Sequence, residues 1–113
     1  MSKEYMGKKV LLLDGYGRQI PSLMQQLHRL GCVITVLCDS KLNVGYTSRY
    51  PHKKLVVRGI REDYDIYKAA VEKELSNEQY DILFPVLEKA TEISLSDELR
   101  EKYPKLEPLY WWS

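Results

Sequence analysis

Two glycines and an arginine form the first group of residues whose types and spacing suit ligand binding. Gly15 and Gly17 follow the apolar run Val10–Leu13, and Arg18 comes directly after them. Glycine permits positive φ and a close approach of the backbone to a ligand, and a guanidinium can bind a carboxylate or phosphate through two hydrogen bonds. A helix is expected to begin near Pro21, where free N–H groups favour an anion. The segment predicts where a ligand would bind, although a structural turn without a ligand fits the same residues.

Three further positions could contribute polar groups. Asp39 ends a second apolar run, where a carboxylate could hold a ribose hydroxyl. Glu88 follows a later apolar run and could bind an amine, or it could simply complement the dipole of a helix start. Ser48 and Arg49 belong to a long loop, where they could cover a bound anion or hold the loop down. The residues alone leave each of these alternatives open.

Composition argues against several functional classes. A chain of 113 residues is enough for one domain. Its 17 basic and 16 acidic residues give a net charge of +1, which argues against the clustered positive surface of a nucleic-acid or membrane partner. No apolar run approaches the length of a membrane span. Cys32 and Cys38 stand six residues apart in one expected strand and cannot bridge within it, so reduced thiols and a cytoplasmic location are expected.

The elements that must position these residues alternate along the chain. Apolar, β-branched runs predict four strands: Val10–Leu13, Cys32–Leu37, Leu55–Val57 and Tyr80–Phe84. Helical periodicity predicts helices over residues 20–30, from the N-cap Asp63 to about residue 76, and over residues 87–99. The second helix is expected to bury one stripe: Ile66, Tyr67, Ala70, Val71 and Leu75. The segment 41–53 is expected to be irregular, and so is the proline-rich tail from residue 104.

This alternation predicts an α/β fold, a Rossmann-like doubly wound parallel sheet of about four strands with helices on both faces. We expect the strand order 3-2-1-4, which changes direction between the first and fourth strands. In such sheets the ligand crevice lies at that point, outside the carboxyl ends of the strands. The residues gathered there would be 14–18, 39–41 and 85–91.

Four segments, in order along the chain, resemble the pre-ATP-grasp domain that stands at the N-terminus of ATP-grasp ligases, such as the carbamoyl-phosphate synthase large chain and biotin carboxylase. They are Lys9–Arg18, Leu30–Ile34, Thr47–Tyr50 and Tyr80–Thr91. The resemblance covers most of the chain from residue 9 to about residue 99. It implies a domain over residues 1–103, with a tail over 104–113 that leads toward a further domain.

The resemblance also implies a function. In this family the domain helps to bind the acceptor substrate, two later domains hold ATP and Mg²⁺, and a carboxylate is activated as an acyl phosphate that an amine attacks. The positions that match the family's binding motifs are Gly15, Gly17, Arg18, Ser48, Arg49, Glu88 and Thr91. Asp39 joins them through its place after the second expected strand.

This chain contains no segment that matches the ATP-binding domains. We therefore expect it to be inactive alone and to hold no cofactor or metal itself, with an ATP-grasp domain in cis as its partner. Its substrate would be a small carboxylate or amine, with no nucleic acid or membrane as partner. Two alternatives remain: a small nucleotide- or anion-binding Rossmann module that uses Asp39, and a domain that dimerises through the aromatic tail Tyr110–Trp112.

Overall fold

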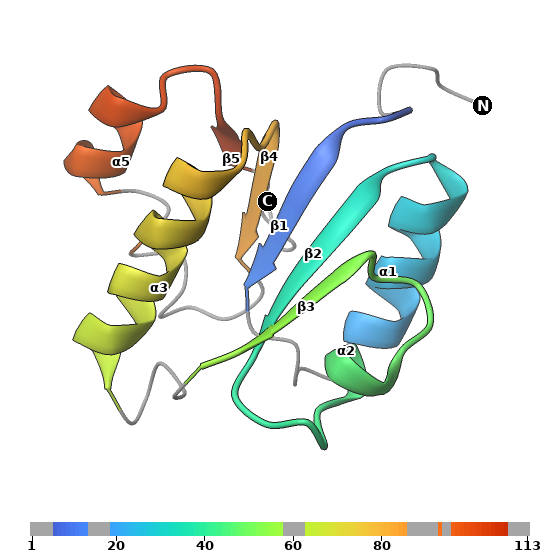
Figure 1. Ribbon diagram of the computed structural model, residues 1–113. Coiled ribbons are helices and arrows are strands. Elements are labelled where there is room, and N and C mark those ends of the chain that lie inside the picture. The colour runs from blue at the N-terminus through green and yellow to red at the C-terminus, as the bar shows by residue number, and fades with distance from the viewer. Residues whose placement is uncertain (1–5, 14–18, 58–62, 86–92, 94–95, 109–113) are drawn as a thin grey trace.

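The computed structural model describes residues 6–13, 19–57, 63–85, 93 and 96–108 of the chain. Within these residues, parallel strands form one sheet in the order β3-β2-β1-β4-β5 (Figure 1). The strands are β1 (Lys9–Leu13), β2 (Val33–Cys38), β3 (Lys53–Val56), β4 (Ile82–Pro85) and β5 (Glu107–Pro108). The α/β class and the predicted order 3-2-1-4 are confirmed, and β5 extends the sheet beyond β4.

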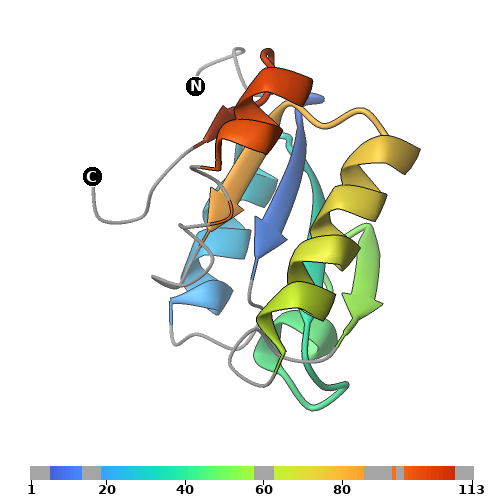
Figure 2. The same ribbon diagram turned by 90° about the vertical axis from the view of Figure 1, so that its left-hand side faces the viewer.

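Helices cover both faces of the sheet (Figures 1 and 2). The described helices are α1 (Ile20–Arg29), α2 (Val44–Thr47), α3 (Tyr64–Asn77) and α5 (Asp97–Lys102). The two views place α1 and α2 on one face and α3 and α5 on the other. This two-sided covering explains why the central strands are continuously apolar rather than alternating.

Three local signals produce the predicted helix ends. Pro21 lies in the first turn of α1, where its missing N–H costs nothing. Gly31 follows the last residues of α1 with φ +83°, a left-handed conformation that favours glycine. Asp63 caps α3, its Oδ1 accepting a hydrogen bond from the N–H of Ile66 at 3.1 Å.

The core has two halves, one on each side of the sheet. Alternate residues of β1 belong to different halves: Val10 and Leu12 pack toward α1, while Leu11 and Leu13 pack toward α3. The α1 half is completed chiefly by Ile20, Leu23, Met24, Leu27, Ile34 and Val36. The α3 half is completed chiefly by Leu37, Tyr67, Val71, Leu75, Leu83, Ile93 and Leu99.

Some sequence predictions were wrong in detail. The segment 41–53 is not wholly irregular, because α2 forms within it. A continuous helix over 87–99 is excluded by Ser96, which has extended φ and ψ and caps α5 instead. The tail contains β5, which gains backbone partners from β4. Ile66 is 45% exposed, because the buried stripe of α3 continues through Glu74 rather than through Ile66.

Candidate functional site

The carboxyl edge of the sheet, where the strands end, brings three chain segments together. Leu13 of β1 pairs with Leu37 of β2 on one side and with Pro85 of β4 on the other. Strands β2 and β3 lie on one side of β1, and β4 and β5 lie on the other. Connections that leave such a reversal point diverge to opposite faces and open a crevice between them. The chain therefore leaves the sheet after Leu13 and after Pro85 from adjacent positions at this edge.

The predicted site residues divide between described and undescribed parts of the chain. Gly15, Gly17, Arg18, Glu88 and Thr91 lie outside the described residues. Their roles stay predictions.

Asp39 is a predicted site residue that the structure does describe. It is the first residue after β2 and is exposed at the carboxyl edge. Its N–H donates to Asn43 Oδ1 at 3.0 Å, and this bond closes the turn that leads into α2. Asp39 thus stands on a short turn at the edge where the crevice was expected.

Ser48 and Arg49 anchor the segment that follows α2. The N–H of Tyr50 donates to Ser48 Oγ at 3.2 Å, and the Arg49 guanidinium lies 5.4 Å from the centroid of the Tyr50 ring. That ring lies 5.0 Å from the ring of His28. Because His28 is about 12 Å along α1 from its first residue, Arg49 packs toward the end of α1 that is remote from the carboxyl edge. These contacts hold the segment against α1, while a substrate contact of either residue stays a prediction.

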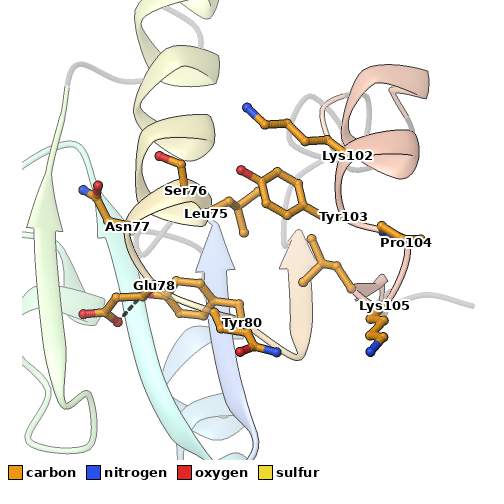
Figure 3. Close-up of a pocket in the computed structure, with 11 residues that line it drawn as sticks. Leu75, Ser76, Asn77, Glu78, Tyr80, Lys102, Tyr103, Pro104 and Lys105 are labelled. Atoms are coloured by element: carbon orange, nitrogen blue, oxygen red, sulfur yellow. Dashed lines mark hydrogen bonds between the residues drawn. The ribbon is translucent and has the colours of Figure 1, made fainter.

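A groove of about 440 Å³ lies at the amino edge of the sheet, where the strands begin (Figure 3). Its walls come from the end of α3 and from the segment between α5 and β5, and they include Leu75, Tyr80, Lys102, Tyr103 and Leu106. Tyr103 Oη is buried and has no hydrogen-bond partner among the described residues. This volume is near the lower end of the range for small-molecule sites. The groove is on the opposite edge of the sheet from Asp39.

A cluster of five polar residues borders this groove, and we call it the Glu74 cluster: Thr35, Lys53, Glu74, Glu78 and Tyr80. Tyr80 Oη lies 2.6 Å from Glu74 Oε2 and 3.0 Å from Thr35 Oγ1. Lys53 Nζ donates to Glu74 Oε2 at 2.8 Å and to Glu78 Oε1 at 3.3 Å. Glu74 is only 5% exposed, so its charge is tolerated because both neighbours bond to it.

The cluster shifts three pKa values in directions that favour the observed pairs. Burial, reinforced by the hydrogen bond to Glu74, raises the pKa of the Tyr80 phenol. The hydrogen bond to Glu74 raises the pKa of Lys53, and the hydrogen bond from Lys53 lowers the pKa of Glu78. A protonated phenol, an ammonium and a carboxylate that satisfy one another form a structural network. With pKa values shifted in these directions, Tyr80, Lys53 and Glu78 are not poised to exchange a proton near neutral pH.

Sequence reasoning missed the Glu74 cluster, although one signal for it was available. Glu74 stands seven residues after Tyr67 on α3, a position on the same helical face. An acid at an inward position needs a cation or hydroxyl from elsewhere in the fold. Its partners lie in β2, at the start of β3 and just before β4. The sequence alone does not show that these distant segments meet Glu74.

Other site chemistry is not found in the described parts of the chain. No group of three or more His, Cys, Asp or Glu residues there could hold a metal ion. Cys32 and Cys38 are buried and not joined in a disulfide, and burial raises the pKa of the Cys32 thiol. None of the described helices is long and apolar enough to cross a membrane.

Comparison with known proteins shows a shared fold. No family model matches the sequence, and no curated protein gives a significant match. The structure is similar to glycinamide-RNase-transformylase T from Mycobacterium tuberculosis (TM-score 0.64, 19% identity, 89% of this chain and 26% of that one). It is also similar to AibC (TM-score 0.66, 17% identity, covering 96% of this chain and 35% of that one). A third match is epimerase Mth375 from Methanothermobacter thermautotrophicus (TM-score 0.50, 20% identity, covering 87% of this chain and 29% of that one).

These likenesses establish the α/β fold alone, since all identities are 20% or below. The chain spans about a quarter to a third of the length of the solved structures it matches. One of those proteins is named a transformylase and another an epimerase. A single fold thus occurs in proteins named for different chemistries, so the chemistry must be argued from the site.

Proposed function

We propose that this chain is the N-terminal, acceptor-binding domain of an ATP-dependent carboxylate–amine ligase of the ATP-grasp type. The observation that carries the proposal is the pairing of Leu13 between Leu37 and Pro85 in a sheet of order β3-β2-β1-β4-β5. In this arrangement β1 and β4, the strands that precede the glycine segment and the segment with Glu88 in the sequence, end side by side. Both segments belong to the four whose sequences resemble the pre-ATP-grasp domain.

Within this proposal the chain's own residues bind and orient the acceptor. Arg18 supplies a guanidinium for a carboxylate, Glu88 supplies a carboxylate for an amine, and Gly15 and Gly17 allow the backbone to approach the ligand. Asp39 borders the same edge from β2. ATP and Mg²⁺ supply the phosphoryl group and are held by domains outside this chain. The fold shared with longer proteins, one of them named a transformylase, supports a role as one domain of a larger enzyme.

The first test is to read the source gene beyond the codon for Ser113. A frame that continues through an ATP-grasp domain is expected. The product of the complete frame should then release phosphate from ATP only when a suitable carboxylic acid and amine are both present. A stop codon directly after Ser113, with no ATP-grasp gene beside it, would overturn the proposal.

A second test uses variants of that complete product. Arg18→Ala and Glu88→Gln are expected to raise the KM for the acceptor by about tenfold or more, since each removes a charge-assisted hydrogen bond worth about 1.5–3 kcal/mol. Arg100→Ala is the matched control, because Arg100 is exposed on α5. Equal KM values in all three variants would contradict the assigned roles.

One observation supports the alternative of a nucleotide-binding Rossmann module: Asp39 is exposed at the carboxyl end of β2. A carboxylate there can hold the two hydroxyls of a ribose. Titration with NAD, followed through the fluorescence of Trp111 and Trp112, separates the two proposals. Saturable quenching that is lost in Asp39→Ala would favour the module, and no response would leave the ligase domain as the better proposal.

A further inference from the structure

The charges of this protein are separated along the chain, although the total is nearly balanced. Residues 15–61 contain eight lysines and arginines: Arg18, Arg29, Lys41, Arg49, Lys53, Lys54, Arg58 and Arg61. The same stretch contains one acid, Asp39. The remaining residues of the chain carry the other 15 of the 16 acids. The net charge of +1 is therefore an average over two unlike halves.

The fold turns this separation into two unlike layers. The layer of α1, α2 and the segment between β2 and β3 presents a basic face, which we define by four exposed cations: Arg29, Lys41, Arg49 and Lys54. In the opposite layer, α3 and α5 carry six acids against four cations. The acids are Asp65, Glu72, Glu74, Asp97, Glu98 and Glu101, and the cations are Lys68, Lys73, Arg100 and Lys102. Figure 1 shows the sheet between the two layers.

The strand β3 contributes one lysine to each of the two layers. Lys53 and Lys54 are consecutive, and consecutive side chains of a strand point to opposite faces of the sheet. Lys53 accordingly pairs with Glu74 of α3, whereas Lys54 Nζ lies 5.3 Å over the ring of Tyr46 in α2. One lysine is neutralised within the acidic layer, and the other is added to the basic face.

Aromatic rings hold two of the four cations in place. Lys54 lies over Tyr46, and the Arg49 guanidinium lies 5.4 Å from the Tyr50 centroid. Both tyrosines are partly buried and pack against the α1 half of the core. Cations held in this way lose less conformational freedom when they bind an anion. Proteins that bind single-stranded nucleic acids combine a positively charged surface with aromatic side chains, and both kinds of group are present on this face.

We propose that the basic face binds the phosphate backbone of a single-stranded nucleic acid. The overall charge balance argued against such a partner, but it averages the basic layer with the acidic one. The proposal does not rest on the ligase function, because the basic face lies on the outer side of α1 and α2 and its test measures binding alone.

Salt dependence gives the sharpest test. A fluorescein-labelled oligouridylate is titrated with the 113-residue chain and followed by anisotropy. Each phosphate neutralised on a single strand adds about 0.7 to the slope of log K against log salt. Four cations predict a slope near −2.8, so affinity should fall about 50-fold between about 50 mM and about 200 mM salt. In the double variant Arg49→Gln/Lys54→Gln the slope should halve, and the loss should be only about sevenfold.

The matched control is Lys73→Gln/Arg100→Gln, which removes two exposed cations from the acidic layer. It should bind like the unchanged chain, and circular dichroism checks that both double variants are folded. Three results would overturn the proposal: no anisotropy change at low salt, an equal loss of affinity in both double variants, or binding to phosphatidylserine vesicles without binding to the oligonucleotide.

Discussion

Lys53 Nζ lies 2.8 Å from Glu74 Oε2, which joins the first residue of the edge strand β3 to the last turn of α3. The same carboxylate oxygen lies 2.6 Å from Tyr80 Oη, just before β4. A single buried acid therefore links three elements that are far apart in the sequence. An edge strand of four residues has backbone partners on one side only, so this side-chain contact supplies part of what holds β3 in place.

Replacing Glu74 should destabilise the protein more than replacing a neighbouring acid. Glu74→Gln keeps the volume but removes the charge that Lys53 and Tyr80 bind. We expect a loss of about 1.5–3 kcal/mol in the free energy of unfolding, since hydrogen bonds to charged groups have this magnitude. Urea unfolding followed by circular dichroism measures it. Glu72→Gln on the same helix is the control, and equal effects of the two substitutions would show that the cluster adds nothing.

Two tyrosines beside one groove should respond oppositely to loss of their hydroxyls. Tyr80 Oη is paired with Glu74 and Thr35, so Tyr80→Phe should cost about 1.5–3 kcal/mol. Tyr103 Oη is buried without a partner among the described residues, so Tyr103→Phe should be neutral or stabilising by about 1 kcal/mol. Thermal and urea unfolding of the two variants provide the comparison. A marked loss in Tyr103→Phe would reveal a partner for that hydroxyl.

Acid should weaken the fold through Glu78. The hydrogen bond from Lys53 lowers the pKa of Glu78 in the folded protein, so the unfolded chain binds the proton more readily. The contribution of Glu78 is complete above the ordinary glutamate pKa of about 4.3 and is lost as the pH falls through the lower folded value. Urea midpoints measured at decreasing pH should fall less steeply in Glu78→Gln than in the unchanged chain. Glu101→Gln, at an exposed position of α5, should leave the slope as it is.

Alanine substitutions at Gly7 and Gly31 distinguish the cost of a left-handed backbone from the cost of crowding by a new side chain. Gly31 has φ +83°, and a Cβ there would lie 3.2 Å from Met6 Cγ and 3.3 Å from Met6 Cα. Gly7 has φ +78°, but a Cβ there would meet nothing within 4 Å. Gly7→Ala should cost the left-handed conformation alone, about 1–2 kcal/mol, and Gly31→Ala should cost more. Equal losses in urea unfolding would show that Met6 moves aside freely.

The fold was largely predictable, whereas the site was predictable only in part. The strand order followed from alternating apolar runs and helical patterns, since right-handed crossovers leave few topologies. Asp39 was correctly expected after the second strand, because apolar runs mark strand ends. For Arg49 the sequence left two roles open, and the structure shows a contact with Tyr50 that holds the loop against α1, while an anion contact stays a prediction. Gly15, Arg18 and Glu88 stay predictions.

What the sequence alone determined is local: the apolar strands, the Asp63 cap, the Gly31 helix end and the alternation that produces a parallel sheet. Such features depend on a few neighbouring residues, so a short window of sequence encodes them. Only the tertiary structure decided that Glu74 is buried, that β5 joins β4, and that Lys53 and Lys54 serve opposite layers. Those outcomes depend on which distant segments pack together. A buried charge such as Glu74 is tolerated only when its partners, which come from other segments, lie beside it.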